Sequence, residues 1–268
     1  MRAVVSATYL YPIKACAPLR VTSLAFAPSG DIHGDREWVV VDADDRITWM
    51  GAIPTLAQII PIGTLDNLAI SSAAGETAVL PPPGEGAPRT VQSWNGQRQA
   101  FDALVGNDAG DVVAELASTI AGQPIRLVHL TTTTHRPNPV HLISVASLSV
   151  LASQLGRDTD LLRFRPNVVL SGDGDALPPF VEEKATSLVC DSAQSRLMLE
   201  ITIPCERCIV TNVDPVSSVV DAAYLKTIAA HSRGRGTSAP AVFGVYACAT
   251  TGGVLATGDR VELVIAGR

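Results

Sequence analysis

Short runs of alternating apolar and polar positions dominate the first half of the chain. The runs at residues 3–10 and 19–27 predict strands around a proline-rich turn, and residues 39–42 and 47–50 predict a hairpin. Residues 63–79 predict further short strands, whereas the proline-rich stretch 81–88 predicts a loop. The first half is therefore expected to be mostly β, with short strands that close into a barrel or sandwich.

Helical spacing appears in three places among further strands. Apolar residues at helical spacing predict a helix over 111–121, which residues 107–109 can cap, and a second helix over 144–154 that Ser144 can cap. A short helix is expected at 221–230. Strands are expected at 125–130, 167–170, 197–203, 209–213, 242–249 and 260–266. The fold class is thus mainly β with a few helices (α+β), and a boundary near residue 125 separates two halves that share an interface.

Two thiols, Cys205 and Cys208, lie three residues apart between the strands expected at 197–203 and 209–213. A thioredoxin-like pair opens a helix, which the β-rich residues after Cys208 disfavour. A structural zinc site needs about four ligands, and the other cysteines are isolated. Two interpretations stay open: one thiolate binds a soft metal beside a companion thiol, or both are small buried apolar side chains.

Five further motifs occur in a fixed order around these cysteines. They are Tyr11-Pro12-Ile13-Lys14, Gly34-Asp35-Arg36, Arg165-Pro166-Asn167, Phe243-Gly244-Val245-Tyr246 and Gly258-Asp259-Arg260-Val261. With them, the chain resembles the MOSC family over nearly its whole length. The likeness is to the two-part type seen in amidoxime-reducing molybdenum enzymes. This resemblance implies an N-terminal MOSC-associated β-barrel domain at 1–125 and a MOSC-type β-barrel domain at 126–268.

The resemblance also implies which residues hold a molybdenum cofactor, Mo-molybdopterin. It places the metal-ligating and catalytic thiolate at Cys208, with Cys205 as the alternative, and thiolate is a soft ligand that suits such a centre. It places Arg165 and Asn167 on the cofactor, where a guanidinium fork and an amide can grip a phosphate and a pterin edge. The alternative for Arg165 is a surface ion pair. Arg163 would face the opposite side of the chain.

Three residues from other segments are implied to reach the same cofactor. Lys14 and Arg36 come from the first half and would contact its anionic end. The alternative is that both are solvated surface charges, with Asp35 paired to Arg36. Tyr246 matches a tyrosine near the cofactor, and its alternative is a core aromatic residue whose hydroxyl is satisfied.

The sequence departs from the family pattern in two places. Ala15 stands where a small polar residue is usual. Arg136-Pro137-Asn138 replaces an acidic stretch, although Asn138 can keep a cofactor contact. Among the histidines, His33 is nearest to the candidate site. The remaining four have no ligand-like spacing and are expected to be structural or solvated: His129, His135, His141 and His231.

Composition excludes several classes of protein. With 47% hydrophobic and 17% charged residues, the chain of 268 residues is globular rather than disordered. A net charge of −6 disfavours a general nucleic-acid surface. No apolar run is long enough to span a membrane, the N-terminus lacks a signal peptide's apolar core, and five irregularly spaced cysteines form no disulfide framework. A cytoplasmic location is therefore expected.

The resemblance implies an oxidoreductase that reduces N-hydroxylated or N-oxide small molecules, with S-oxides as a related class. No Gly-x-Gly-x-x-Gly stretch follows a strand and no four cysteines cluster, so a separate electron-transfer protein or reductase is expected to supply electrons. The alternative is a protein that binds or carries the molybdenum cofactor, or carries sulfur as a persulfide, without turnover of its own.

Overall fold

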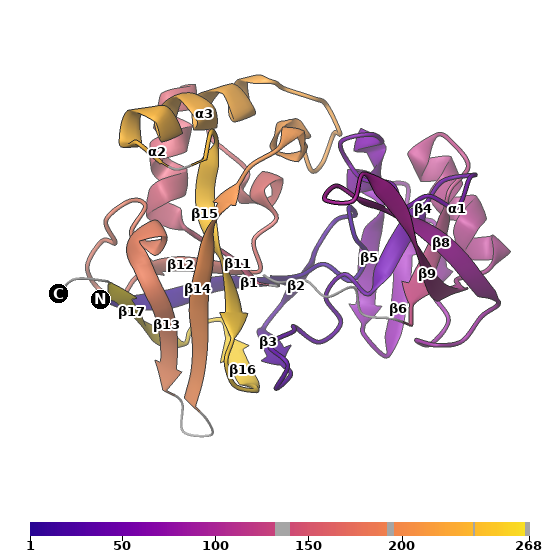
Figure 1. Cartoon of the computed structure of the whole chain (residues 1–268), viewed down its shortest axis with the longest axis horizontal. Coiled ribbons are helices and arrows are strands. Elements are labelled where there is room, and N and C mark those ends of the chain that lie inside the picture. The colour runs from indigo at the N-terminus through magenta and orange to yellow at the C-terminus, as the bar shows by residue number, and fades with distance from the viewer. Residues whose placement is uncertain (132–139, 192–195, 238, 266–268) are drawn as a thin grey trace.

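The structure is a computed structural model that describes residues 1–131, 140–191, 196–237 and 239–265. Figure 1 shows two lobes side by side, and the segments around β1 and β2 run between them. No helix among the described residues is long and apolar enough to cross a membrane.

The larger lobe is a sheet of eight strands in the order β12-β11-β15-β14-β13-β17-β1-β2. Because β1 also pairs with β12, seven of these strands close into a barrel. The strands are β1 (Arg2–Leu10), β2 (Leu19–Val21), β11 (Val140–Ser144), β12 (Val168–Gly172), β13 (Ala185–Asp191), β14 (Arg196–Glu206), β15 (Val242–Ala249) and β17 (Arg260–Ile265). The predicted fold class, mainly β with a few helices, is confirmed.

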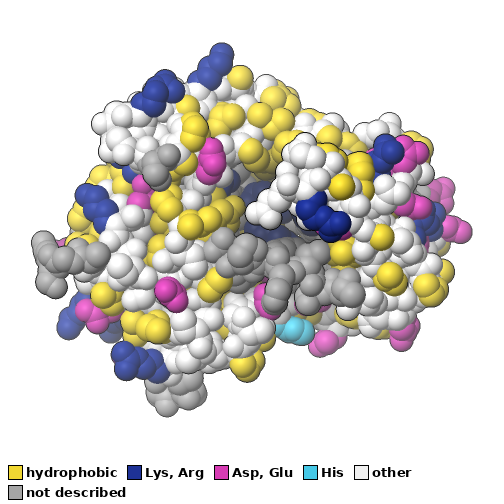
Figure 2. Space-filling model, in the orientation of Figure 1, with side chains coloured by type: hydrophobic (Ala, Val, Ile, Leu, Met, Phe, Trp, Pro, Cys, Tyr) yellow, Lys and Arg dark blue, Asp and Glu magenta, His cyan; other side chains and the backbone are white. Residues whose placement is uncertain are grey.

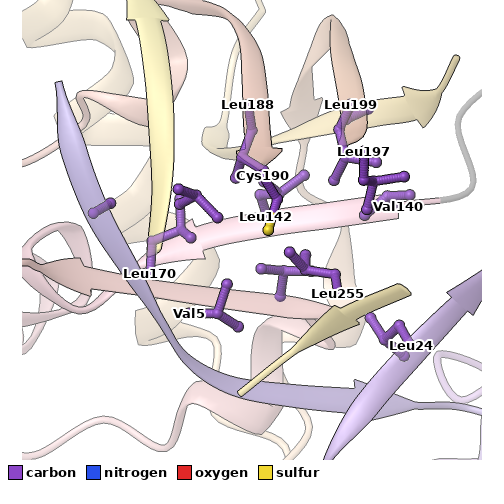
Figure 3. Packing of buried hydrophobic residues seen from close by; sticks show 14 of the residues in the cluster. Val5, Leu24, Val140, Leu142, Leu170, Leu188, Cys190, Leu197, Leu199 and Leu255 are labelled. Atoms are coloured by element: carbon purple, nitrogen blue, oxygen red, sulfur yellow. The ribbon is translucent and has the colours of Figure 1, made fainter. Parts of the chain in front are cut away.

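Strand β1 ties the first residues of the chain into the barrel formed by the second half. Ala3 is opposite Gly172 of β12 on one side and Val261 of β17 on the other. Alternate residues of β1 point inward, and Figure 3 shows Val5 among the apolar side chains of the barrel core. The halves therefore share secondary structure, and the predicted boundary near residue 125 stays a prediction.

The smaller lobe carries two sheets and one long helix. One sheet has the order β4-β10-β9-β8 and the other β5-β6-β7. The elements are β4 (Trp38–Val41), the 3-10 helix η1 (Pro54–Gln58), β5 (Ile60–Thr64), β6 (Asn67–Ser71), β7 (Thr77–Val79), β8 (Pro88–Asn95), β9 (Ala100–Asp108), α1 (Asp111–Ala121) and β10 (Arg126–Leu130). A third pair, β3 (Ser23–Phe26) with β16 (Gly253–Ala256), joins the two halves of the chain again.

The helices agree with the sequence in position more closely than in their ends. α1 occupies the predicted residues, but Gly110 is its N-cap, and Asp108 accepts a hydrogen bond from the Gly110 N–H rather than capping the helix. α2 (Val145–Leu155) is capped by Ser144, whose Oγ accepts from the Ser147 N–H, as predicted. α3 (Ala223–Arg235) is longer than expected, and Figure 1 shows α2 and α3 together at one end of the barrel lobe.

The chain around the two cysteines differs from the prediction of two strands joined by a connection. Cys205 lies inside β14, whose pairing with β15 shifts on either side of Pro204, which is where a strand tolerates proline. The segment after Cys208 is not a strand but the 3-10 helix η4 (Ile209–Asn212), in which Thr211 Oγ1 donates to the Cys208 carbonyl. A local hydrogen bond and tertiary packing here override the β-propensity of Ile, Val and Thr.

A second prediction was wrong in part. Residues 47–50 do not form a regular second strand, but the segment does fold back on β4: an antiparallel bridge joins Val41 to Ile47, and the Thr48 N–H donates to the Val40 carbonyl. On its other side, the Ile47 N–H donates to the Gln92 carbonyl of β8. The second half of the chain also contains two short 3-10 helices, η2 (Leu161–Phe164) and η3 (Glu182–Lys184). An isolated β-bridge joins Val213 to Val220.

Candidate functional site

The sequence-predicted site residues come from segments that meet where the two lobes join. Figure 2 shows a hollow at this junction with Lys and Arg side chains deep inside it. Three backbone hydrogen bonds hold the N-terminal segments together: Arg36 N–H to Tyr11 O, at 2.6 Å, Lys14 N–H to Trp38 O, at 2.8 Å, and Trp38 N–H to Pro12 O, at 3.0 Å. The Tyr-Pro-Ile-Lys motif at 11–14 and the Gly-Asp-Arg motif at 34–36 are therefore adjacent in space.

Asn167, directly before β12, connects these segments to the second half of the chain. It is fully buried, and its Nδ2 donates to Tyr9 O and to Asp35 Oδ1, both at 3.2 Å. Its Oδ1 accepts from Arg36 Nη1 at 3.4 Å and from the His141 N–H at 3.2 Å. An amide is one of the few side chains that can both donate and accept in this way. Through these four hydrogen bonds, Asn167 fixes the Arg36 segment relative to β1 and β11.

Tyr11 carries two arginines on its ring. The guanidinium carbon of Arg165 lies 4.3 Å from the ring centroid and that of Arg36 lies 5.0 Å from it. Asp35 forms an ion pair with Arg36 and accepts from the Tyr11 N–H at 2.9 Å. Arg165 Nη1 donates to the Cys16 carbonyl, but its buried Nη2 has no partner among the described residues. Burial, together with the charge of Arg36, lowers the pKa of Arg165 to about 10.

Backbone strain gathers at the same place. Ala15, Arg36 and Arg165 have φ angles of 71°, 57° and 53°, in the left-handed region that disfavours side chains with a Cβ. Each belongs to, or directly follows, a motif that the sequence assigned to the site. Such conformations persist only where surrounding contacts enforce them, and they cluster at functional sites.

The two cysteines have different environments. Cys208 is exposed, whereas Cys205 is fully buried and its sulfur accepts a hydrogen bond from Arg207 Nη1 at 2.8 Å. Burial acts to raise the pKa of Cys205, but the charges of Arg207 and His141 outweigh it, and the net effect is a lowered pKa. Arg207 Nη2 also donates to the Phe164 carbonyl, which anchors the cysteine segment to the turn before Arg165.

Two residues at this site were not singled out in the sequence. Arg207 was given no role, although an arginine between two candidate thiols is a signal of thiolate stabilisation. His141 was expected to be structural or solvated. It lies in β11 with 2% exposure, and its ring centroid is 5.5 Å from that of Tyr246, the predicted site tyrosine. A single polar residue in the apolar run 140–143 gave no spacing signal.

Other predicted residues are placed less centrally or fall outside the description. Lys14, three residues after the buried Tyr11, is exposed. Asn138 lies outside the described residues. Arg163 is buried and faces away from Arg165, with its Nη1 on the Asn212 carbonyl and an ion pair to Asp214. His33 is exposed and lies in the loop before Arg36.

Family models cover almost all of the chain. The MOSC domain model matches residues 128–262. The MOSC N-terminal beta barrel domain model matches residues 2–124. The chain belongs to the MOSC domain family.

Named relatives of this MOSC protein fall into two groups. Mitochondrial amidoxime-reducing component 1 of Homo sapiens is 26% identical over 290 residues, which cover 97% of this chain and 82% of the relative. Mitochondrial amidoxime reducing component 2 of Rattus norvegicus is 29% identical over 244 residues, covering 81% of this chain and 68% of the relative. Molybdenum cofactor sulfurase of Danio rerio is 26% identical over 274 residues, covering 89% of this chain but only 31% of the relative.

The charges of the MOSC site fit an anionic cofactor. Arg36, Arg165 and Arg207 lie in or beside the junction. Asp35 offsets Arg36, and the sulfur of Cys205 offsets Arg207. Arg165 keeps a buried Nη2 without a partner among the described residues, and the same holds for Arg207 Nε. Buried donors without partners are costly, so these arginines are suited to a phosphate-bearing group with several acceptor oxygens.

Proposed function

We propose that this chain binds a molybdenum cofactor at the junction of its halves and reduces N-hydroxylated or N-oxide small molecules, with S-oxides as a related class. The observation that carries the proposal is the strained, cationic surface around Tyr11, next to a segment that exposes the thiol of Cys208. Cys208 directly follows Arg207 in the chain, so the thiol lies beside that arginine. A soft ligand and anion-binding donors are therefore found side by side.

The residues of this chain would hold the cofactor from several directions. Cys208 offers a thiolate to the metal, with Cys205 as the less accessible alternative because it is buried against Arg207. Arg165 and Arg36 would bind the anionic end, and Asn167 keeps both segments in register. Lys14 would approach from the rim and Tyr246 from β15, and Asn138 remains a predicted contact. When bound, the cofactor supplies a metal centre that takes oxygen from the substrate and is re-reduced by outside electrons.

The polar residues that we assign to the site are buried, whereas Cys208 is exposed. Tyr11, Cys205, Asn167 and His141 are each at most 2% exposed, so water has little access to their polar groups. We propose that residues 1–125 and 126–268 form the two domains, with β1 inserted into the barrel of the second. We also propose a cytoplasmic protein that receives electrons from a separate electron-transfer protein or reductase.

The deciding experiment is metal and pterin analysis combined with turnover. Purified protein from a molybdenum-replete host is expected to contain molybdenum and pterin in near-equal amounts and to reduce an amidoxime with a reduced dye. Cys208→Ser is expected to abolish turnover and lower the molybdenum content, whereas Cys248→Ser, at a half-buried thiol in β15, is the matched control and should do neither.

Two results would count against this function. Wild-type activity in Cys208→Ser would remove the thiol from the reaction. Full cofactor loading without turnover on any N-hydroxylated substrate or donor would instead favour a carrier of the cofactor or of persulfide sulfur, the second candidate. The exposed position of Cys208 and the similarity to a molybdenum cofactor sulfurase support that candidate.

A further inference from the structure

One short element, the 3-10 helix η2, is attached to the cysteine segment on both sides of Cys208. Before Cys208, Arg207 Nη2 donates to the Phe164 carbonyl of η2 at 2.8 Å. After Cys208, at the end of η4, the Asn212 carbonyl accepts from Nη1 of Arg163, a residue of η2, at 3.1 Å. The segment that carries the exposed thiol is therefore held at both of its ends by the same element.

Arg163 also holds the turn that follows η4. Its Nη2 forms an ion pair with one carboxylate oxygen of Asp214, and the other oxygen accepts from the Val216 and Ser217 N–H groups. The guanidinium carbon lies 4.0 Å from the ring centroid of Tyr224, and the side chain is only 7% exposed. A buried guanidinium that is bonded on two sides and stacked on a ring has one allowed orientation. Arg163 therefore fixes the end of η4 and the turn after it together.

The same element presents Arg165 to the candidate site. Arg165 is the C-cap of η2, with a φ of 53°, and its side chain lies on the Tyr11 ring with Nη1 on the Cys16 carbonyl. Arg163, two residues earlier, is directed away from it, toward η4. Arg165 thus faces the anion-binding side of η2 and Arg163 faces the side that holds the thiol segment. The spacing between Arg165 and Cys208 depends on both contacts.

We propose that Arg163 is a positioning residue, which holds Cys208 at a fixed distance from the guanidinium of Arg165. This rests on the proposed function for its purpose, since a cofactor bound by both residues needs its metal end and its anionic end held at one spacing. Arg163 does not touch substrate, metal or cofactor in this role. It acts through the Asn212 carbonyl and the Asp214 carboxylate.

Three variants isolate the contacts of Arg163. Arg163→Met removes the donors but keeps an unbranched side chain to pack on Tyr224. Arg163→Lys keeps a charge for Asp214 but lacks the planar fork that reaches two acceptors at once. Arg157→Met is the matched control, because Arg157 also lies over Tyr224, 5.1 Å from its ring centroid, but forms its ion pair with Asp221.

The positioning role can be measured without any cofactor. In full-length protein from a host that makes no molybdenum cofactor, amide hydrogen exchange reports how often each segment opens. The Thr211 and Val213 N–H groups are bonded inside η4, at 3.2 and 3.0 Å. Their exchange should be about tenfold faster or more in Arg163→Met, as expected for a lost hydrogen bond to a charged group, and unchanged in Arg157→Met. Exchange in β13, within the barrel, should stay unchanged in both.

Two exchange results would overturn the proposal. Unchanged exchange of η4 in Arg163→Met would mean that the packing of Val210 and Val213 in the core of the smaller lobe holds η4 by itself. Equally faster exchange in β13 would mean that Arg163 contributes only to general stability. Asp214→Asn breaks the same ion pair from its partly exposed side, and should speed exchange of η4 in the same way.

The consequence for binding is measured on protein from a molybdenum-replete host. Arg163→Met should lower retained molybdenum and pterin by about 10- to 100-fold, the range for residues that orient a metal ligand from behind. Arg163→Lys should recover part of this loss, and Arg157→Met should retain the wild-type amount. Full retention in Arg163→Met, no recovery in Arg163→Lys, or an equal loss in Arg157→Met would overturn the positioning role. If wild-type protein binds no cofactor at all, the proposed function fails instead, and hydrogen exchange still decides whether Arg163 holds η4.

Discussion

Arg207 Nη1 donates a hydrogen bond to the sulfur of Cys205 at 2.8 Å, two residues away along the same segment. This contact gives the two cysteines different chemistry. Cys205 is a buried partner of a guanidinium, while Cys208 is exposed at the start of η4. The effect extends to β15, where burial and the nearby Cys205 charge raise the pKa of Tyr246 to about 12. A thiolate at Cys205 would thus keep Tyr246 protonated.

The Arg207–Cys205 pair predicts a pH-dependent stability. Because the pKa of Cys205 is lowered in the folded protein, the native state binds fewer protons than the unfolded state between the two pKa values. The pair's stabilisation is fully present above the ordinary thiol pKa of about 8.5 and is lost as pH falls through the folded value. In a Cys208→Ser background, the free energy of unfolding lost in Cys205→Ser should grow as pH is raised toward about 8.5.

Cys190 is the matched control for this measurement. It is also buried, in the barrel core shown in Figure 3, but burial there raises its pKa to about 11. Urea unfolding of Cys190→Ser should show no such growth below a pH of about 8.5. A loss in Cys205→Ser that is independent of pH would mean that Cys205 is a neutral core thiol.

Much of the fold could be predicted from local patterns. The helix over residues 111–121 follows from its apolar spacing, although Val112 proves to be 73% exposed while Val113 is buried. Ser144 was predicted as a cap and is one. The conformation of the residues after Cys208 could not be predicted from local patterns. Residues 209–213 have high β-propensity, but Thr211 bonds back to Cys208 and the chain turns instead.

The site was predictable only in part, for a physical reason. Motifs and resemblance pointed to Arg36, Arg165 and Asn167, which the structure brings together. Their geometry depends on contacts between residues more than a hundred positions apart, such as Asn167 with Arg36. Partners of that kind leave no local periodicity, so His141 was assigned no role. Whether Cys208 binds a metal stays a prediction.

Asp108 predicts a second pH dependence, far from the site. It accepts a bidentate pair of hydrogen bonds from Arg126, at 2.6 and 2.9 Å, and a further one from Arg89 at 3.1 Å. Burial opposes its ionisation, but these donors and the Gly110 N–H lower its pKa overall. Its stabilisation is therefore present above the ordinary Asp value of about 3.9 and is lost as pH falls through the lower folded value.

The Asp108 effect is measured by comparing unfolding of wild type and Asp108→Asn. At neutral pH the substitution should lower the free energy of unfolding by about 1–3 kcal/mol. The lower end of this range allows for solvent screening, because both arginines are partly exposed. The cost should shrink when pH is lowered well below about 3.9. Asp44→Asn removes an exposed ion pair with Arg46 and should change stability little at any pH.

Tyr11 predicts a contrast between two substitutions. Its ring is fully buried under Arg36 and Arg165, but its hydroxyl has no partner among the described residues. Tyr11→Phe keeps the ring and should change the free energy of unfolding by less than about 1 kcal/mol. Tyr11→Ala removes the ring and should cost about 3–5 kcal/mol. A large loss in Tyr11→Phe would show that the hydroxyl has an essential partner, such as a bound group.

Arg165 gives the sharpest prediction about the site itself. Its Nη1 is used on the Cys16 carbonyl, its guanidinium rests on Tyr11, and its buried Nη2 points to no acceptor among the described residues. A protein interior seldom keeps such a donor unless a ligand satisfies it. Arg165→Ala should therefore reduce retained molybdenum and pterin about tenfold or more, since a charge-assisted contact contributes about 1.5–3 kcal/mol.

One further variant at Arg165 shows whether the geometry of its guanidinium, and not its charge alone, matters for binding. Arg165→Lys keeps the charge but has no planar fork, so it should restore only part of the binding. Lys14→Ala should also reduce retention, but by less, because Lys14 is exposed and its contacts are screened by solvent. Arg233→Ala, at an exposed position of α3, is the control. Elemental analysis after dialysis measures all four variants, and full retention in Arg165→Ala would mean that its Nη2 faces no ligand.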